Sequence, residues 1–290
     1  MPDFILGAPT HFAVEYASND LTDPTAVVDT AKAAAQFNRL YEKLGGADRV
    51  AIIPAGSKDR YPDFTFVSNA GLFITDSIFI PSRFHVKERR GEEDVAAAWV
   101  SAHQGTVIRL PEEEGLYFEG QGDCRWSHGG SRLWIGFGAG RTTRKGAEAV
   151  RSILKPMGIT VTPLHIRDPR TYHLDLCLCP LPNGRALWHS GSFLPAGKES
   201  LRAAFPKGLI DVPIKNIYGC NCVVLDARTL LTPRLADSQF RSWMAQRTDM
   251  RIVDVNVSEF QKAGGSVSCM VLPVTRSNGN AASGSVSASL

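Results

Sequence analysis

Apolar residues recur at the spacing of amphipathic helices in several segments of the chain. Predicted helices cover residues 33–44, 92–102 and 150–157, with shorter ones at 201–205, 240–244 and 257–262. The first is followed by Gly45, whose missing side chain permits the left-handed turn that ends many helices. The second opens on three acidic residues and the third follows Thr143, both typical of a helix start. Because each apolar stripe is one-sided, we expect each helix to cover a sheet.

Between these helices lie five strand-like runs of similar build, in which a polar or glycine-containing step leads into an apolar stretch. They cover residues 64–74, 117–126, 172–179, 219–225 and 264–272. At intervals of 48 to 54 residues, each run carries a polar residue at a comparable place: Asn69, Glu119, His173, Asn221 and Cys269. Recurrence at about 50 residues is typical of repeat architectures, and the alternation of strands and helices predicts an α/β fold.

The length of 290 residues alone would suggest two domains, at about 150 residues each. The recurrence favours a single domain of five units over residues 1–276 instead. The remainder, residues 277–290, is small and polar, which predicts a disordered tail.

Composition narrows the class of protein. With 43% hydrophobic and 21% charged residues, the chain is typical of globular proteins rather than of disordered, collagen-like or mucin-like ones. It has no apolar run of about 18 residues and no signal-peptide pattern at its start, so we expect a cytoplasmic protein that does not enter a membrane. A net charge of +3 without a cluster of basic and aromatic residues argues against a nucleic-acid partner, whereas a homo-oligomer is compatible with it.

The six cysteines are too few for a disulfide scaffold. The pairs Cys177/Cys179 and Cys220/Cys222 fit buried, reduced thiols, because alternate residues of a strand face the same core. A zinc site explains this Cys-x-Cys spacing less economically, so we expect no metal. Cys124 has no assigned role.

Polar residues with chemical potential lie where apolar runs meet turn-like segments. They are Asn69, Glu119, Asp123, His173, Asp175, Asn221 and Cys269. In a closed ring of repeats these positions would converge. Carboxylates, an imidazole and a thiol in one pocket are the components of covalent catalysis on a cationic substrate.

A guanidinium group fits this set of side chains. It is planar and always protonated, so it needs coplanar acceptors, which Glu119 and Asp175 would supply. A thiol with an ordinary pKa of about 8.5 is mostly protonated at pH 7. A cation about 4 Å away, at an effective dielectric of about 20, contributes about 4 kcal/mol, or about 3 pKa units, so the substrate itself would turn Cys269 into the nucleophile. His173 would protonate the leaving amine and then activate water.

Each of these residues also has a purely structural explanation. A cysteine is often a small core residue, although Gly264-Gly265 before Cys269 permits the close backbone approach found at sites. His173 would be an ordinary buried histidine, unless Asp175, on the same face of a strand, orients its ring. Acidic residues such as Glu119 are equally common in turns.

Three motifs together resemble the signature of the pentein superfamily of guanidine-modifying enzymes. They are Phe118-Glu-Gly-x-Gly-Asp123, His173-Leu-Asp175 and Gly264-Gly-x-x-x-Cys269. The likeness extends to residues 66–72, 82–84, 88–93, 140–142 and 172–181. The superfamily includes arginine deiminases, amidinotransferases, dimethylarginine hydrolases and arginine dihydrolases. The resemblance implies a five-bladed α/β propeller with pseudo-fivefold repeats around a central active site.

The same resemblance implies roles for individual residues. Cys269 would be the nucleophile, His173 the general acid and base, and Glu119 a catalytic carboxylate beside the imidazole. Asp175 would bind the guanidinium, and Arg141 and Arg90 the carboxylate of the substrate. The other substrate-binding candidates are Asn69, Asn19, Asp63, Asp123 and Asn221.

Two positions separate this chain from individual branches of the superfamily. Many deiminases carry Asp at the position of Asn69. Arginine dihydrolases resemble this chain in carrying Asn there. Those dihydrolases also carry an Asn-Pro-Trp motif near the N-terminus, of which only Asn19 is retained here, so one or two hydrolytic steps both stay open. Dimethylarginine hydrolases generally lack the His-x-Asp pair that His173 and Asp175 form.

The sequence thus predicts a Cys-dependent hydrolase of arginine or an arginine-like guanidino compound, of the dihydrolase or deiminase type, without metal or organic cofactor. Alternatives within the superfamily are a dimethylarginine dimethylaminohydrolase and an amidinotransferase, in which a second amine replaces water. An alternative of another class is a non-catalytic binding protein with the pentein fold.

Overall fold

The computed structural model describes residues 1–55 and 61–274, in which fifteen strands form five three-stranded sheets. Every sheet has the same plan: an inner strand pairs antiparallel with a middle strand, which pairs parallel with an outer strand. A helix connects the middle strand to the outer one, as a parallel pairing requires.

The five units differ only in the bounds of these elements. Listed as inner, middle, helix and outer, the first is β15 (Val271–Pro273), β1 (Phe4–Gly7), α1 (Thr30–Leu44) and β2 (Val50–Ile53). The second is β3 (Gly71–Phe73), β4 (Ile78–Pro81), α2 (Glu92–Ala102) and β5 (Thr106–Val107). The third is β6 (Cys124–Ser127), β7 (Arg132–Gly138), α3 (Arg144–Leu154) and β8 (Thr160–Ile166). The fourth is β9 (Leu178–Pro180), β10 (Ala186–Trp188), α5 (Pro195–Ala204) and β11 (Leu209–Asp211). The fifth is β12 (Val223–Asp226), β13 (Thr229–Pro233), α6 (Phe240–Thr248) and β14 (Arg251–Val255).

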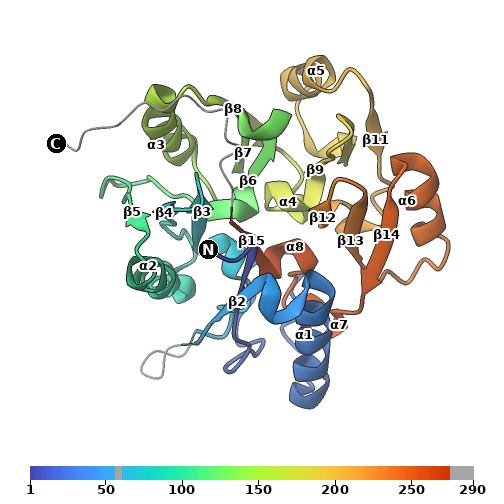
Figure 1. Cartoon of the computed structure of the whole chain (residues 1–290), viewed down its shortest axis with the longest axis horizontal. Coiled ribbons are helices and arrows are strands. Elements are labelled where there is room, and N and C mark those ends of the chain that lie inside the picture. Colours follow the sequence, from blue (N-terminus) through green and yellow to red (C-terminus); the bar gives the residue numbers. More distant parts are fainter. Residues whose placement is uncertain (56–60, 275–290) are drawn as a thin grey trace.

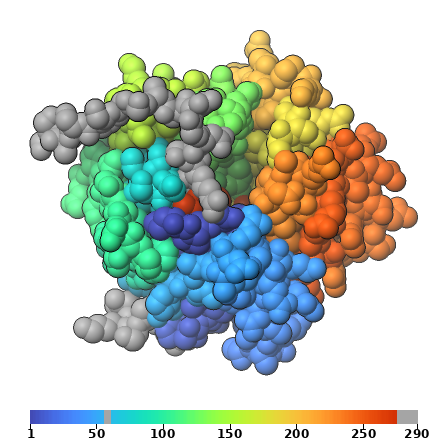
Figure 2. All heavy atoms as spheres, in the orientation of Figure 1, coloured from blue at the N-terminus to red at the C-terminus, as the bar shows by residue number. Residues whose placement is uncertain are grey.

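The sheets stand around a central axis, with α1, α2, α3, α5 and α6 on the outside of the ring (Figure 1). In the space-filling view, successive parts of the chain follow one another around the ring (Figure 2). Five hydrophobic clusters fill the spaces between the elements. The predicted five-bladed α/β propeller is thus confirmed. The ring closes within the first blade, where β15 pairs with β1.

The predicted helices and their ends follow from local chemistry. Asp29 caps α1 by accepting from the backbone N–H of Lys32, and Gly45 ends it at φ 111°. Thr143 caps α3 in the same way, through the N–H of Gly146. The predicted helix at 257–262 is the single turn α7 (Ser258–Gln261), which connects β14 to the last inner segment rather than covering a sheet.

A short helical turn precedes every inner strand, which corrects the prediction of continuous strand-like runs. These turns are η2 (Val67–Ala70), η4 (Gly120–Asp123), α4 (Leu174–Cys177), η9 (Ile217–Cys220) and α8 (Val267–Met270). Backbone hydrogen bonds such as Met270 N–H to the Ser266 carbonyl form within the turn. Their apolar side chains therefore belong partly to a helix, and the inner strand begins only afterwards. The remaining short turns are η1 (Gly46–Asp48), η3 (Lys87–Arg89), η5 (His128–Gly130), η6 (Lys155–Met157), η7 (Pro169–Thr171) and η8 (Ser190–Ser192).

The cysteines illustrate the effect of these turns. All six are buried and free of disulfides. Cys220 and Cys222 share one core cluster, as predicted. Cys177 and Cys179 do not, because Cys177 is the last residue of α4 and packs in a different cluster from Cys179 in β9.

Two further sequence predictions concern the domain bounds and the absence of a membrane-spanning segment. The polar tail 277–290 lies outside the described residues, and the single domain over 1–276 stays a prediction. Within residues 1–55 and 61–274, every helix is too short or too polar to cross a membrane.

Candidate active site

The inner turns bring the recurring polar residues together at the axis of the ring. Asn69 lies in η2, Glu119 directly before η4, His173 directly before α4, Asn221 directly after η9 and Cys269 in α8. Each of these side chains is between 0% and 2% exposed. A buried polar group needs a partner, so their contacts with one another decide what the cluster can do.

One half of the cluster surrounds the imidazole of His173. Its Nε2 donates to Glu119 Oε2 over 2.8 Å, and Arg141 donates to the same oxygen over 2.8 Å. Burial opposes ionisation of Glu119, but Arg141 and His173 outweigh it and hold the pKa of Glu119 well below its ordinary value. Glu119 is therefore a fixed negative charge that orients the ring. We call these residues, with Asn69, the imidazole half.

The second nitrogen of the ring faces Asn69. The amide nitrogen of Asn69 lies 3.4 Å from His173 Nδ1, and its oxygen accepts from Arg89 over 3.1 Å. Arg89 is itself paired with Glu92 at 2.6 Å, and both are almost fully buried. This chain of contacts fixes which atom of the amide faces the imidazole, because Arg89 can only donate.

The other half of the cluster surrounds the thiol of Cys269. Its Sγ donates to Asp175 Oδ2 over 3.2 Å, and the amide of Asn221 donates to Sγ over 3.3 Å. Asn221 is held in turn by the backbone N–H of Ser268, 2.8 Å from its oxygen. Burial, followed by the Asp175 carboxylate, raises the pKa of Cys269 well above its ordinary value. We call Cys269, Asp175 and Asn221 the thiol half.

The second oxygen of Asp175 is the exception in this network. Asp175 is 0% exposed, yet its Oδ1 has no hydrogen-bond partner among the described residues. An unpaired, buried carboxylate oxygen is energetically costly unless something else donates to it. Beside a thiol, it is a ready acceptor for the N–H groups of a cationic ligand.

The expected pairing of His173 with Asp175 is wrong. The prediction placed both on one face of a strand, but His173 is the extended residue before α4 and Asp175 lies inside that helical turn. Their side chains therefore leave in different directions, and Glu119 contacts the imidazole instead.

Several of the other predicted residues are tied into the walls of the cluster. Asp123 accepts from the Thr142 hydroxyl over 2.6 Å and from the Leu174 N–H over 3.1 Å, and burial raises its pKa to about 6. Its nearer oxygen is 3.9 Å from His173 Nε2. Asp63 accepts from the Tyr16 hydroxyl over 2.8 Å. Both carboxylates already have partners within the protein.

Three predicted residues, Asn19, Arg141 and Arg90, make hydrogen bonds to the backbone of other residues. Asn19 bridges the backbone of Leu21 and Ala263. Arg141 also donates to the Ser18 carbonyl over 2.5 Å, so its guanidinium has partners on two sides. Arg90 is exposed and donates to the backbone carbonyls of residues 84 and 85, outside the buried cluster.

Two buried arginines were not among the predicted site residues. For Arg89, the available signal was the acidic residue three positions later, Glu92, with which it forms a buried pair. Arg125 carried no such signal. It lies in β6, is 7% exposed, and places its guanidinium 3.6 Å from Asp175 Oδ2.

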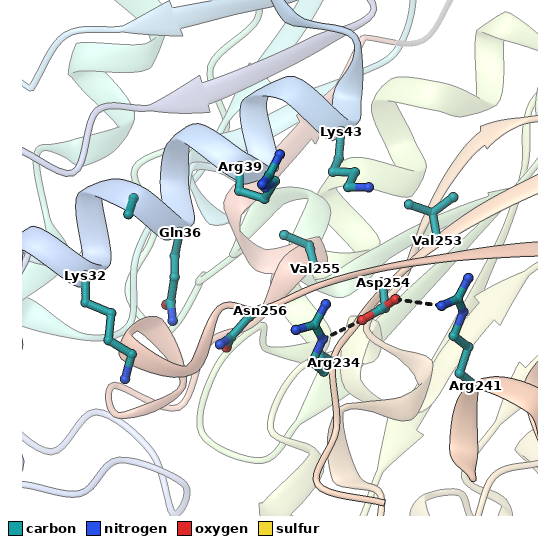
Figure 3. Close-up of a pocket in the computed structure, with 11 residues that line it drawn as sticks. Lys32, Gln36, Arg39, Lys43, Arg234, Arg241, Val253, Asp254, Val255 and Asn256 are labelled. Carbon is teal, nitrogen blue, oxygen red and sulfur yellow. Dashed lines mark hydrogen bonds and ion pairs between the residues drawn. The ribbon is translucent and has the colours of Figure 1, made fainter. Parts of the chain in front are cut away.

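A cleft of about 680 Å³ lies elsewhere, between α1 and the strands of the fifth blade (Figure 3). Its charged lining is basic apart from Asp254, which pairs with two arginines, and consists of Lys32, Arg39, Lys43, Arg234, Arg241 and Asp254. Such a lining does not suit a cationic ligand. In the described part of the chain, no group of three or more His, Cys, Asp or Glu side chains could hold a metal ion.

Comparison with known proteins identifies the family of this chain. Residues 9–276 match the profile of the eukaryotic N,N-dimethylarginine dimethylhydrolase family. The chain belongs to this family. Its five-bladed fold is therefore that of the pentein superfamily, as the motifs predicted.

Relatives in this family carry two different names. The N(G),N(G)-dimethylarginine dimethylaminohydrolase of Mycobacterium tuberculosis is 32% identical over 276 residues, covering 93% of this chain and 85% of that protein. The bifunctional arginine dihydrolase/ornithine cyclodeaminase AgrE of Nostoc sp. is 30% identical over 276 residues, covering 94% of this chain. The match spans only 38% of AgrE.

Solved structures show the same division. A mutant N-terminal domain of the cyanobacterial arginine dihydrolase ArgZ, bound to its substrate, superposes with a TM-score of 0.83 at 28% identity, covering 94% of this chain and 98% of that one. An adduct of a dimethylarginine dimethylaminohydrolase mutant with S-methyl-L-thiocitrulline superposes with a TM-score of 0.75 at 25% identity, covering 94% and 99%.

Proposed function

We propose that this protein is a Cys-dependent hydrolase of arginine or an arginine-like guanidino compound. The observation that carries the proposal is the juxtaposition of the Cys269 thiol with Asp175, whose second oxygen has no partner among the described residues. An oriented imidazole completes the set, because Glu119 fixes His173 in the same buried cluster. The names of the relatives support this class of reaction.

The substrate guanidinium binds by donating to Asp175 Oδ1. Its positive charge, next to the thiol, offsets the burial and the carboxylate that keep Cys269 protonated. The thiol gives its proton to the neutral imidazole of His173, and Sγ attacks the guanidinium carbon. The substrate therefore activates its own nucleophile, and an empty site keeps the thiol inert.

His173 then moves the protons. It donates a proton to the leaving nitrogen as the C–N bond breaks, which leaves an amidino group on Sγ. The neutral ring next takes a proton from a water molecule, whose oxygen attacks the same carbon and breaks the C–S bond. Glu119 stabilises the charged form of the ring at each step. The product is a urea, and the thiol is regenerated.

The two kinds of relative leave two substrates to distinguish. Family membership favours methylated arginines, and the dihydrolase relatives favour arginine. The retention of Asn69 fits the dihydrolases, as the sequence comparison of branches indicated. We propose arginine as the first substrate to test and dimethylarginine as the second.

Product identification after incubation with each substrate tests the proposal. Arginine should yield ammonia with citrulline or ornithine, and dimethylarginine should yield dimethylamine with citrulline. An amidinotransferase would turn over only when an acceptor amine is added. Binding of arginine without any product, with or without an acceptor, would instead identify a non-catalytic binding protein.

A further inference from the structure

A buried arginine next to the thiol half, Arg125, connects residues of three blades. Arg125 Nη1 donates to the Gln121 and Cys124 carbonyls over 2.9 Å each, and Nη2 donates to the Ser268 hydroxyl over 2.8 Å. Its Nε donates to the Leu178 carbonyl over 3.2 Å. The guanidinium is therefore held from three blades, and its position cannot change independently of them.

The charge of this guanidinium is balanced at one place. Among the described residues, the guanidinium forms an ion pair with Asp175, with Nη2 3.6 Å from Oδ2, and the two side chains are 8% and 0% exposed. Removing one partner of such a buried pair leaves the other uncompensated, which is strongly unfavourable. Asp175 Oδ2 thus lies between Arg125 and the Cys269 thiol, and Oδ1 is left for a ligand.

We infer that Arg125 is a positioning residue that supplies the buried counter-charge to the Asp175 carboxylate and keeps it turned so that Oδ1 faces the substrate. The inference rests on the proposed function, in which Oδ1 receives the guanidinium. Arg125 does not itself touch the reacting atoms. It acts through Asp175, as a fixed counter-charge that remains after the product leaves.

Other ionisable groups surround Asp175 and contribute to its electrostatic environment. They lie on α4, on the elements packed against it or facing its carboxylate, and are Tyr172, His173, Cys177, Asp123, Cys124, Arg125, Arg132, Arg170, Cys179, Tyr218, Cys220 and Cys269. Of the other arginines among them, Arg170 is exposed and paired with Asp168, and Arg132 is only half-buried and donates to the Thr162 hydroxyl. Arg125 is therefore the buried, permanently charged group of this set.

The test compares Arg125→Met with Arg125→Lys and Ser268→Ala across pH. Without the counter-charge, Asp175 should hold its proton to higher pH, so the acid limb of kcat/KM for arginine should move up by about one pH unit or more. One unit corresponds to about tenfold at pH values below the limb. The deficit of Arg125→Met should shrink as the pH rises. Arg125→Lys keeps the charge and Ser268→Ala removes only a hydrogen bond, so both should leave the limb near its wild-type position.

A merely structural arginine would give a different pattern. Arg125→Met would then lower the free energy of unfolding, with kcat/KM reduced equally at every pH, and that result would overturn the inference. A shift of the limb in Ser268→Ala as large as in Arg125→Met would overturn it too. Wild-type protein that turns over no guanidino compound would contradict the proposed function instead, so the two failures are distinguishable.

A double variant keeps the test available if Arg125→Met does not fold. Asp175→Asn/Arg125→Met removes both charges, which proteins tolerate better than one buried charge. Arginine binding can be measured as protection of Cys269 from iodoacetamide. If Arg125 acts through Asp175, this variant and Asp175→Asn should bind arginine within about twofold of each other. A further loss of tenfold or more in the double variant would contradict the inference.

Discussion

The imidazole half and the thiol half of the buried cluster differ in how completely their polar atoms are paired. In the imidazole half, Glu119 accepts from both His173 and Arg141, and the Asn69 amide is held by Arg89. In the thiol half, one oxygen of Asp175 has no partner within the described residues. The first half is complete without a ligand, and the second is not.

This difference assigns different tasks to the two halves. A group that transfers protons, such as His173, benefits from fixed partners, because a preorganised site does not need to rearrange during the reaction. A group that must recognise a cation needs a free acceptor. The thiol donates to the other oxygen of Asp175, so recognition and activation take place at one carboxylate.

Replacing the nucleophile of the thiol half should have the largest effect on turnover. Cys269→Ser should lower turnover of arginine by about 10⁴-fold or more, because a hydroxyl is far harder to deprotonate than a thiol, while arginine still binds. Steady-state kinetics and calorimetric titration measure the two effects. Cys179→Ala, another buried thiol, serves as the control and should keep its activity. Ammonia release at the wild-type rate by Cys269→Ser would refute the covalent mechanism.

Removing the charge of the imidazole half should have the next largest effect. Glu119→Gln keeps the shape of the side chain but no longer stabilises a charged His173, so kcat should fall by about 10³-fold. It also leaves Arg141 without its carboxylate, which should lower the free energy of unfolding by about 3–5 kcal/mol. Urea denaturation followed by circular dichroism measures the second quantity. If kcat stays within tenfold of the wild type, Glu119 does not orient the acid and base.

The pH dependence of labelling sharpens the role of the thiol half. The pKa of Cys269 is raised, so the thiol is protonated at neutral pH, and its thiolate fraction grows about tenfold per pH unit below that pKa. Labelling by neutral iodoacetamide should therefore rise through pH 9 without a plateau. Cationic chloroacetamidine should label far faster at pH 7, because it supplies the missing positive charge. Equal rates for both reagents would show that a cation does not activate Cys269.

The smallest expected effect concerns the contact between Asn69 and His173. Asn69→Asp keeps an acceptor for Arg89 but loses the N–H that faces His173 Nδ1, so kcat should fall by about tenfold, the value of one hydrogen bond. The same kinetic assay checks it, with Asn183→Asp, far from the cluster, as the control. An unchanged kcat would mean that the 3.4 Å contact does not position the ring.

The recurrence of polar residues predicted five repeated units, and the resemblance to the pentein superfamily supplied the closed ring in which these residues converge. Asn69, Glu119, His173, Asn221 and Cys269 occupy equivalent places in successive repeats, so a closed ring must bring them together. Which of the site residues contact one another was harder to predict from the sequence. His173 and Asp175 have a spacing that fits a strand face, and only the turn of α4 separates their directions.

The two buried arginines show why the rest of the site could not be predicted. Arg125 is surrounded by residues that are ordinary for a strand, and its partners Leu178, Ser268 and Asp175 come from distant parts of the chain. Their contacts depend on how the blades close around the axis. A periodic pattern records which residues face inward, but not which of them meet.

The closure of the ring through β15 and β1 also orders events during synthesis. Of the fifteen described strands, β1 in the middle of the first blade is made before the others, and its inner neighbour β15 is made after them, directly after the turn that carries Cys269. Until residues 267–273 leave the ribosome, β1 is an open edge and the nucleophile is not available for the site. An interrupted chain would therefore be both prone to aggregation and catalytically inactive. The fold is completed only when the segment with the Cys269 thiol has been made.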